Sequence, residues 1–256
     1  MGTIKKAFLL LLILLLVACK PEQKPRLVVV ISVDHLAYFA YDHYRPVFTG
    51  GFKWLDDNGT SFDNAHHEHG YCSTGPGHFV LGSGLHPGPA GIIGNNWYDR
   101  VNKKDVYCVE DPEVNELDIP ANHMSYNKVN GTSYGDWLKA VSPKSKVYGV
   151  SCKDRASIMM SGKNPDLALW YNWRGSFTTT DYYTDVIPEW LIDFNENLNI
   201  LGYRDSVWTT DLDPQLLAEY THGDSFYGES DRFEKTNYSP VFPIGFEAEW
   251  DDAKVR

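Results

Sequence analysis

Cysteine and basic residues are scarce in this 256-residue sequence, and it contains no internal repeats or low-complexity tracts. Beyond Cys19, the three cysteines at 72, 108 and 152 allow at most one disulfide bond between them, and no CxxC spacing indicates a structural zinc site. Removing Lys5 and Lys6 from the 23 basic residues leaves 21 against 34 acidic ones, a formal charge of −13. This balance argues against a nucleic-acid partner. An anionic substrate would need a local positive feature such as a metal ion.

The longest apolar run, near the N-terminus, is too short to span a bilayer comfortably. Residues 1–18 combine two lysines with this leucine-rich run and end in small residues, a pattern typical of a secretory signal peptide. Leu16-Val17-Ala18-Cys19 resembles a bacterial lipobox, in which the cysteine is acylated. We therefore expect a lipoprotein-type signal peptide over 1–18, a polar tether over 19–25, and a lipid anchor at Cys19. This predicts an exported protein on the periplasmic side, as an outer-membrane lipoprotein. The alternative is an ordinary signal peptide with a chance cysteine.

Apolar runs and helical patterns alternate along most of the remaining chain. The patterns predict strands over 26–34, 145–151, 167–172 and 176–180, a short strand after Gly59, helices over 36–57, 77–85, 134–141 and 188–198, and a hairpin over 95–111. This order predicts an α/β fold with a central, mostly parallel sheet flanked by helices and interrupted by a hairpin insertion. Asp34 ends one predicted strand, and Lys153 and Arg155 come shortly after another. We expect them near one ligand site, because ligands bind at the carboxyl ends of such strands.

Residues 71–78 read YCSTGPGH and contain several possible nucleophiles. Cys72 has no cysteine-protease pattern around it, and Thr74 and Pro76 stand where a sulfatase has proline and arginine. Ser73 lacks the G-x-S-x-G turn of serine hydrolases. Thr74 remains, next to a predicted helix whose N-terminus favours an incoming anion. A threonine hydroxyl needs a base or a metal to become a good nucleophile. The alternative is that Thr74 is only the N-cap of that helix.

Five segments in one order resemble the bacterial threonine-nucleophile alkaline phosphatases, which belong to the alkaline phosphatase / nucleotide pyrophosphatase-phosphodiesterase superfamily. The segments are 28–65, 71–78, 91–100, 107–111 and 151–159, and the resemblance extends from about residue 26 to at least 198. It implies an alkaline phosphatase-like fold and hydrolysis of small phosphomonoesters at a two-zinc site.

The resemblance also implies roles for individual residues. Asp34 matches a metal ligand, and Thr74 matches a nucleophile that coordinates zinc and forms a phosphothreonine intermediate. Asn95 matches a residue that binds a phosphate oxygen. Lys153 and Arg155 match the pair that contacts the phosphoryl group in monoesterases and is missing from diesterases.

Two departures from the family pattern stand out. Ala90 occupies a position where the family usually has histidine, which is not a metal ligand. More seriously, the other zinc ligands of the family lie in its C-terminal half, which would begin about where this sequence ends. The histidine cluster at 66–69 is a poor substitute, because consecutive histidines on a loop cannot all face one ion.

We therefore expect residues 26–256 to be the N-terminal part of a catalytic domain whose C-terminal half is missing. Such a chain would have an incomplete sheet and weak or no activity on its own, because two protein ligands are too few for two tetrahedral zinc ions. Two alternatives stay open: a phosphodiesterase or nucleotide pyrophosphatase of the same superfamily, and an inactive surface lipoprotein fragment.

Overall fold

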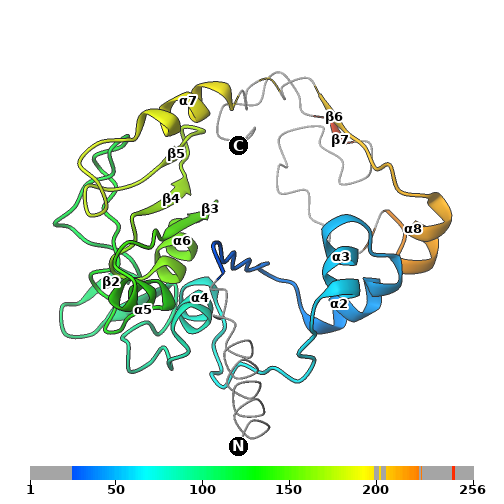
Figure 1. The fold of residues 1–256 in the computed structure, drawn as a ribbon, viewed down its shortest axis with the longest axis horizontal. Helices are drawn as coiled ribbons and strands as arrows, with labels where there is room; N and C mark the ends of the chain where they lie inside the picture. Colours follow the sequence, from blue (N-terminus) through cyan, green and yellow to red (C-terminus); the bar gives the residue numbers. More distant parts are fainter. Residues whose placement is uncertain (1–24, 199–201, 203–205, 225, 227–243, 246–256) are drawn as a thin grey trace, which may run out of the picture. The chain divides into compact units, whose positions relative to one another are not determined.

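The computed structural model describes residues 25–198, 202, 206–224, 226 and 244–245. The chain divides into a unit of residues 1–33 and a unit of residues 34–256. The elements of the second unit, shown in Figure 1, are α2 (Tyr38–Tyr44), the 3-10 helix η1 (Arg45–Val47), α3 (Gly50–Asn58), α4 (Thr74–Ser83), β1 (Asn96–Asp99), β2 (Lys104–Tyr107), α5 (Tyr134–Val141), β3 (Tyr148–Ser151), α6 (Asp154–Ser161), β4 (Leu167–Tyr171), β5 (Phe177–Thr178), α7 (Glu189–Asn197), β6 (Val207–Trp208), α8 (Pro214–Tyr220) and β7 (Ile244–Gly245).

Residues 25–33, the described part of the first unit, form neither a helix nor a strand. The prediction of a buried strand over 26–34 is therefore wrong. Leu27 and Ile31 are 77% and 74% exposed. A β-branched run forms a buried strand only where neighbouring strands pair with it and other layers cover it. No strand among the described residues pairs with this run.

The strands predicted over 145–151 and 167–172 are present as β3 and β4, and the helix between them, α6, was not predicted. β3 pairs with β4 in parallel, with Tyr148 opposite Leu167, and β4 pairs with β5 in the antiparallel sense. A crossover helix is what joins two neighbouring parallel strands, and α6 has that position. Its first turn follows directly after the carboxyl end of β3, which is where an α/β sheet gathers its ligands.

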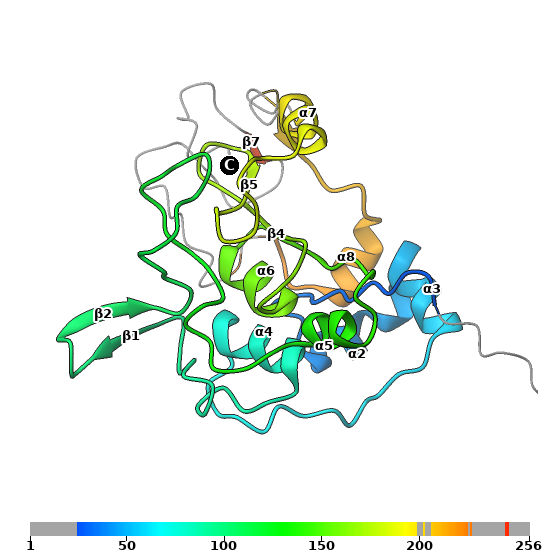
Figure 2. The ribbon, with the colours of Figure 1, turned by 60° about the vertical axis from the view of Figure 1, so that its left-hand side comes forward.

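Helix α6 packs closely on both the sheet and α4. A Cβ at Gly149 would overlap Ser161 Oγ and lie 2.9 Å from the Ser157 carbonyl oxygen, so only glycine lets α6 approach β3 here. Helices α4, α5 and α6 lie beside one another in Figures 1 and 2. The largest core cluster joins them to the loops and strands around them, and its bulkiest fully buried members are Phe79, Ile92, Tyr126, Ile158, Met159 and Trp170. This packing holds the N-termini of α4 and α6 in place.

The predicted helix over 36–57 is two α-helices with a 3-10 turn between them. Pro46 lies in η1, and Gly50 at the start of α3 has φ +56°. Proline lacks the backbone N–H that a helix interior needs, so the chain bends here. The short strand predicted after Gly59 is also wrong, because residues 60–73 form no strand. The predicted helices over 134–141 and 188–198 are confirmed as α5 and α7, and β1 and β2 form the predicted hairpin.

Among the described helices, none is long and apolar enough to span a bilayer. The predicted signal peptide and Cys19 lie outside the described residues.

Asp166 connects the start of β4 to the start of β3. Its carboxylate accepts a hydrogen bond from the Val147 backbone N–H at 2.9 Å and pairs with Lys146 at 2.8 Å and Lys139 at 3.0 Å. Partial burial raises the pKa of Asp166, but the hydrogen bonds and charges of these partners outweigh burial and lower it to about 2.

This lowered pKa predicts that the stabilisation by Asp166 depends on pH. Because the pKa is lower in the folded state, the contribution is fully present above the ordinary value of 3.8 and disappears as pH falls toward about 2. We expect Asp166→Asn to lower the free energy of unfolding by about 1 to 2 kcal/mol at pH 7 and by much less near pH 2. Urea unfolding at both pH values measures this. Asp193→Asn is the control, because Asp193 is exposed on α7 and forms no ion pair within the described residues. A loss that is equal at both pH values would contradict the prediction.

Candidate active site

Thr74 is the first residue of α4, three residues earlier than the predicted start of that helix. Pro76 lies in the first turn, where its missing N–H would have no helical partner anyway. Ser73 occupies the N-cap position, so the alternative that Thr74 is the N-cap is wrong. Thr74 is 8% exposed. Its hydroxyl is therefore largely shielded from solvent at the helix end where the dipole favours negative charge.

Asp34 contacts both Thr74 and Lys153. The Thr74 hydroxyl donates to Asp34 Oδ2 at 3.5 Å, and Lys153 Nζ donates to the same oxygen at 3.2 Å. Asp34 lies in a turn with His35, whose φ of +63° is unusual for a residue other than glycine. Partial burial raises the pKa of Asp34, but the hydrogen bond and charge of Lys153 outweigh burial, so the pKa lies below its ordinary value. The carboxylate is therefore charged at neutral pH.

Asn95 adjoins the first turn of α4. Its Oδ1 accepts a hydrogen bond from the Gly75 backbone N–H at 2.6 Å. A Cβ at Gly75 would lie 3.2 Å from Asn95 Oδ1 and 3.0 Å from Cys108 Sγ, so glycine permits this close approach. This hydrogen bond fixes the orientation of the amide, and its NH₂ group is the part that can donate to an anion.

Lys153 and Arg155 stand at the junction of β3 and α6, with Lys153 as N-cap and Arg155 in the first turn. Lys153 reaches Asp34, whereas Arg155 Nη1 donates to the Tyr107 hydroxyl at 3.0 Å. No hydrogen bond or ion pair connects Arg155 to Asp34 or Thr74 in the described part of the chain. Instead, Arg155 contacts Tyr107 at the end of β2, and the β1–β2 hairpin connects Tyr107 to Asn95. Tyr107 precedes Cys108, whose backbone N–H donates to the Asn95 carbonyl at 2.9 Å.

Tyr107 is the residue of this region that the sequence analysis missed. Its hydroxyl donates to Asp154 Oδ1 at 2.6 Å while it accepts from Arg155. Nothing in the local pattern separates Tyr107 from the other tyrosines of the chain. The only signal was its position in the segment 107–111, one of the five that resemble the family.

The three described cysteines, Cys72, Cys108 and Cys152, are all free. Cys108 is buried beside the site, and burial raises the pKa of its thiol to about 12. The protonated thiol is a weak nucleophile. Of the buried residues at the start of α4 and beside Asn95, Thr74 is therefore the better nucleophile once its hydroxyl is activated.

The donor set for a metal ion is incomplete among the described residues. Asp34 and Thr74 supply two neighbouring oxygen atoms, which suit a divalent cation. However, no group of three or more His, Cys, Asp or Glu side chains in the described part of the chain could hold a metal, the histidines of 66–69 included. Two oxygen donors do not make a tetrahedral zinc site, so these residues fit a metal ion only in part.

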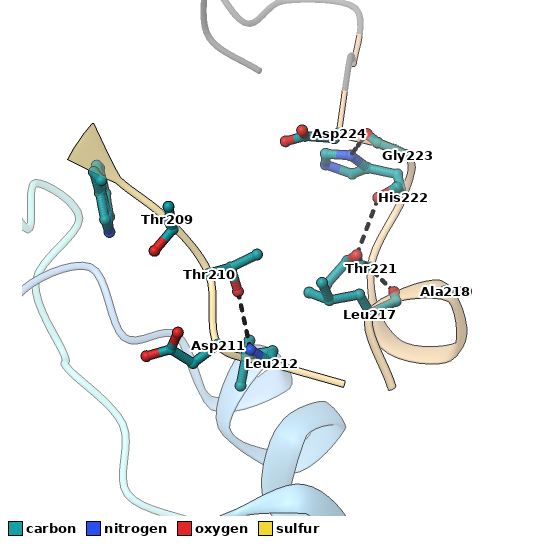
Figure 3. A pocket seen from close by; sticks show the side chains of 11 residues that line it. Thr209, Thr210, Asp211, Leu212, Leu217, Ala218, Thr221, His222, Gly223 and Asp224 are labelled. Carbon is teal, nitrogen blue, oxygen red and sulfur yellow. Dashed lines mark hydrogen bonds between the residues drawn. The ribbon is translucent and has the colours of Figure 1, made fainter. Parts of the chain in front are cut away.

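A separate cavity of about 870 Å³ lies around α8 and the loops next to it. Figure 3 shows its lining, which includes Thr210, Asp211, His222 and Asp224. None of the five residues predicted for the active site lines this cavity. One hydrogen bond in its lining is local, from the Leu212 N–H to Thr210 Oγ1. The chemistry of the candidate site is therefore at the start of α4 and α6.

These features describe an α/β protein in which a threonine hydroxyl, an amide and two basic side chains lie at helix N-termini and a strand end. The chain belongs to the Type I phosphodiesterase / nucleotide pyrophosphatase family, whose profile matches residues 28–238. It is 34% identical over 226 residues to alkaline phosphatase PafA of Elizabethkingia meningoseptica, covering 86% of this chain and 41% of the relative. It is 33% identical to alkaline phosphatase PhoV of Synechococcus elongatus, covering 85% of this chain and 40% of the relative.

A solved structure agrees with these relatives. The crystal structure of a PafA variant matches with a TM-score of 0.74 and 30% sequence identity, covering 87% of this chain and 43% of that chain. The predicted α/β, alkaline phosphatase-like fold is therefore confirmed for the part of the fold that this chain spans. The chain spans about two fifths of the length of the curated relatives named above.

Proposed function

We propose that this protein hydrolyses phosphomonoesters, with Thr74 as the nucleophile. The observation that carries the proposal is the buried Thr74 hydroxyl at the N-terminus of α4, hydrogen-bonded to Asp34, which also pairs with Lys153. A hydroxyl, a carboxylate and an ammonium group thus meet where the helix dipole favours an anion. The names of the relatives support the same class of reaction.

The proposed reaction has two steps. Thr74 Oγ1 forms a bond to phosphorus while the bond from phosphorus to the leaving oxygen breaks, which gives a phosphothreonine and releases the alcohol. Water then attacks the phosphothreonine, releases inorganic phosphate and restores the hydroxyl. Splitting one substitution into two is the usual benefit of a covalent nucleophile.

Three side chains are proposed to hold the phosphoryl oxygens. The hydrogen bond that Asn95 Oδ1 accepts from the Gly75 N–H fixes the orientation of the amide, whose NH₂ group can donate to the anion. Lys153 and Arg155 add two positive charges, and the planar guanidinium suits a phosphoryl group especially well. The PafA variant of the solved structure supports this choice, because it carries substitutions of one threonine, one asparagine, one lysine and one arginine, in that order along its chain. The same four residue types stand in the same order here.

We propose that two zinc ions take part, with Asp34 and Thr74 as ligands and the remaining ligands outside the described residues. When bound, divalent ions make a hydroxyl more nucleophilic and neutralise charge on phosphate oxygens. The partial donor set at Asp34 and Thr74 supports the position of such a site. The lipid anchor at Cys19 and the periplasmic location stay predictions from the sequence.

The family name favours a second function, hydrolysis of phosphodiesters. The two functions are separated by comparing kcat/KM of the full-length protein for p-nitrophenyl phosphate and for bis(p-nitrophenyl) phosphate. Because Lys153 and Arg155 suit the additional charge of a monoester, we expect the monoester to be the better substrate by about a hundredfold or more. A preference for the diester would overturn the proposed function.

A further inference from the structure

The Tyr107 side chain lies between the two charged residues that begin α6. Its hydroxyl donates to Asp154 Oδ1 at 2.6 Å and accepts from Arg155 Nη1 at 3.0 Å, and the guanidinium carbon lies 5.9 Å from the centre of the ring. A phenol has one proton to donate. Since that proton goes to the carboxylate, the lone pairs of the oxygen remain for the guanidinium, and both hydrogen bonds have a fixed direction.

The phenol also acts as a spacer between opposite charges. Arg155 Nη1 is 3.9 Å from Asp154 Oδ1, longer than a charge-assisted hydrogen bond. Asp154 is held in place, because the same oxygen accepts the Arg155 backbone N–H at 2.6 Å. Both side chains are largely buried, with exposed fractions of 22% for Arg155 and 17% for Asp154, so their attraction is only weakly screened. Without the phenol, the guanidinium would move toward Asp154.

Arg155 keeps a donor that no hydrogen bond uses among the described residues. Its Nε–H is buried and has no hydrogen-bond partner in the described part of the chain. A buried donor without a partner is costly unless a ligand satisfies it. The Tyr107 hydroxyl thus accepts a hydrogen bond from Nη1 of Arg155, and the Nε–H is left to bind an anion.

We propose that Tyr107 is a positioning residue for Arg155, and that its hydroxyl keeps the guanidinium away from Asp154 and free to bind the phosphoryl group. This inference rests on the proposed function, in which Arg155 binds that group. Burial, together with the charge and hydrogen bond of Asp154, raises the pKa of Tyr107 well above its ordinary value. The phenol therefore stays protonated in alkaline solution and continues to donate to Asp154.

The test is Tyr107→Phe in the full-length protein, which removes the hydroxyl and keeps the ring. We expect kcat/KM for p-nitrophenyl phosphate to fall about tenfold and the inhibition constant for inorganic phosphate to rise by a similar factor. The kcat/KM for the bis ester should change little. Tyr98→Phe is the matched control, because Tyr98 lies in β1 of the same hairpin but is 57% exposed. It should leave all three values unchanged.

A double-mutant cycle with Arg155→Ala shows whether Tyr107 acts through the arginine. If it does, Tyr107→Phe causes little further loss when Arg155→Ala is already present. Additive losses, or wild-type phosphate inhibition in Tyr107→Phe, would overturn the positioning role while leaving the proposed function intact. If Arg155→Ala alone does not change monoester hydrolysis or phosphate inhibition, Arg155 has no role in phosphoryl binding, and both proposals fail at that step. A lower melting temperature of Tyr107→Phe with unchanged phosphate inhibition would assign the hydroxyl to stability alone and would also contradict the inference.

Discussion

Replacing Thr74 with alanine is expected to lower kcat/KM for p-nitrophenyl phosphate by about a thousandfold or more in the full-length protein. The substitution removes the only oxygen proposed to form a bond to phosphorus, and Asn95 cannot take its place because its amide is not nucleophilic. The remaining activity would come from direct attack of water on a bound substrate. Steady-state kinetics with the wild type and the variant measure the effect.

Two further variants control for effects of structure. Thr74→Ser keeps the hydroxyl and should retain much more activity than Thr74→Ala, because the nucleophilic atom is still present. Ser73→Ala removes the neighbouring hydroxyl, which is buried but has no hydrogen-bond partner among the described residues, and should change kcat/KM little. If Thr74→Ala remains active while Ser73→Ala does not, the nucleophile has been assigned to the wrong residue.

Substitution of the two basic residues at the start of α6 should change which substrates are hydrolysed. We expect Lys153→Ala and Arg155→Ala each to lower kcat/KM for the monoester by about a hundredfold. The same variants should lower kcat/KM for the bis ester much less, because a diester has one negative charge fewer on its phosphoryl oxygens. The measurement is the ratio of the two kcat/KM values in each variant.

Lys163→Ala is the control for a general effect of positive charge, because Lys163 follows α6 at its other end. Its substitution should lower neither kcat/KM value appreciably. If Lys153→Ala and Arg155→Ala lower kcat/KM equally for the monoester and the diester, the two residues do not recognise the monoester. Their substitution would then act on both substrates alike, for example by destabilising the fold.

Parts of this fold that depend on local signals were predictable from the sequence. The helix over 134–141 is preceded by Ser133, which forms a capping box with Asp136, and both ends of α5 agree with the prediction. The hairpin and the strands β3 and β4 likewise follow from turn residues and apolar runs, whereas the helix α6 between those strands was not predicted. Lys153 and Arg155 were placed correctly beside the carboxyl end of a strand, because chain order alone puts them there.

Other parts depend on contacts that a pattern cannot specify. The run over 26–34 has the composition of a buried strand, yet residues 25–33 form no strand, and Leu27 and Ile31 are exposed. The start of α4 was placed too late because Gly75 and Pro76 were interpreted as a turn, although both fit the first turn of a helix. Tyr107 was missed because its importance comes from Asp154 and Arg155, which lie almost fifty residues further along the chain.

The most direct test of the account is to look for the covalent intermediate. The full-length protein is mixed with a phosphomonoester, quenched in acid during turnover, digested and analysed by mass spectrometry. The account predicts phosphate on Thr74 in the wild type and no phosphopeptide in Thr74→Ala. Phosphate on another residue, or rapid turnover of the wild type with no phosphorylated peptide under any quench condition, would contradict it.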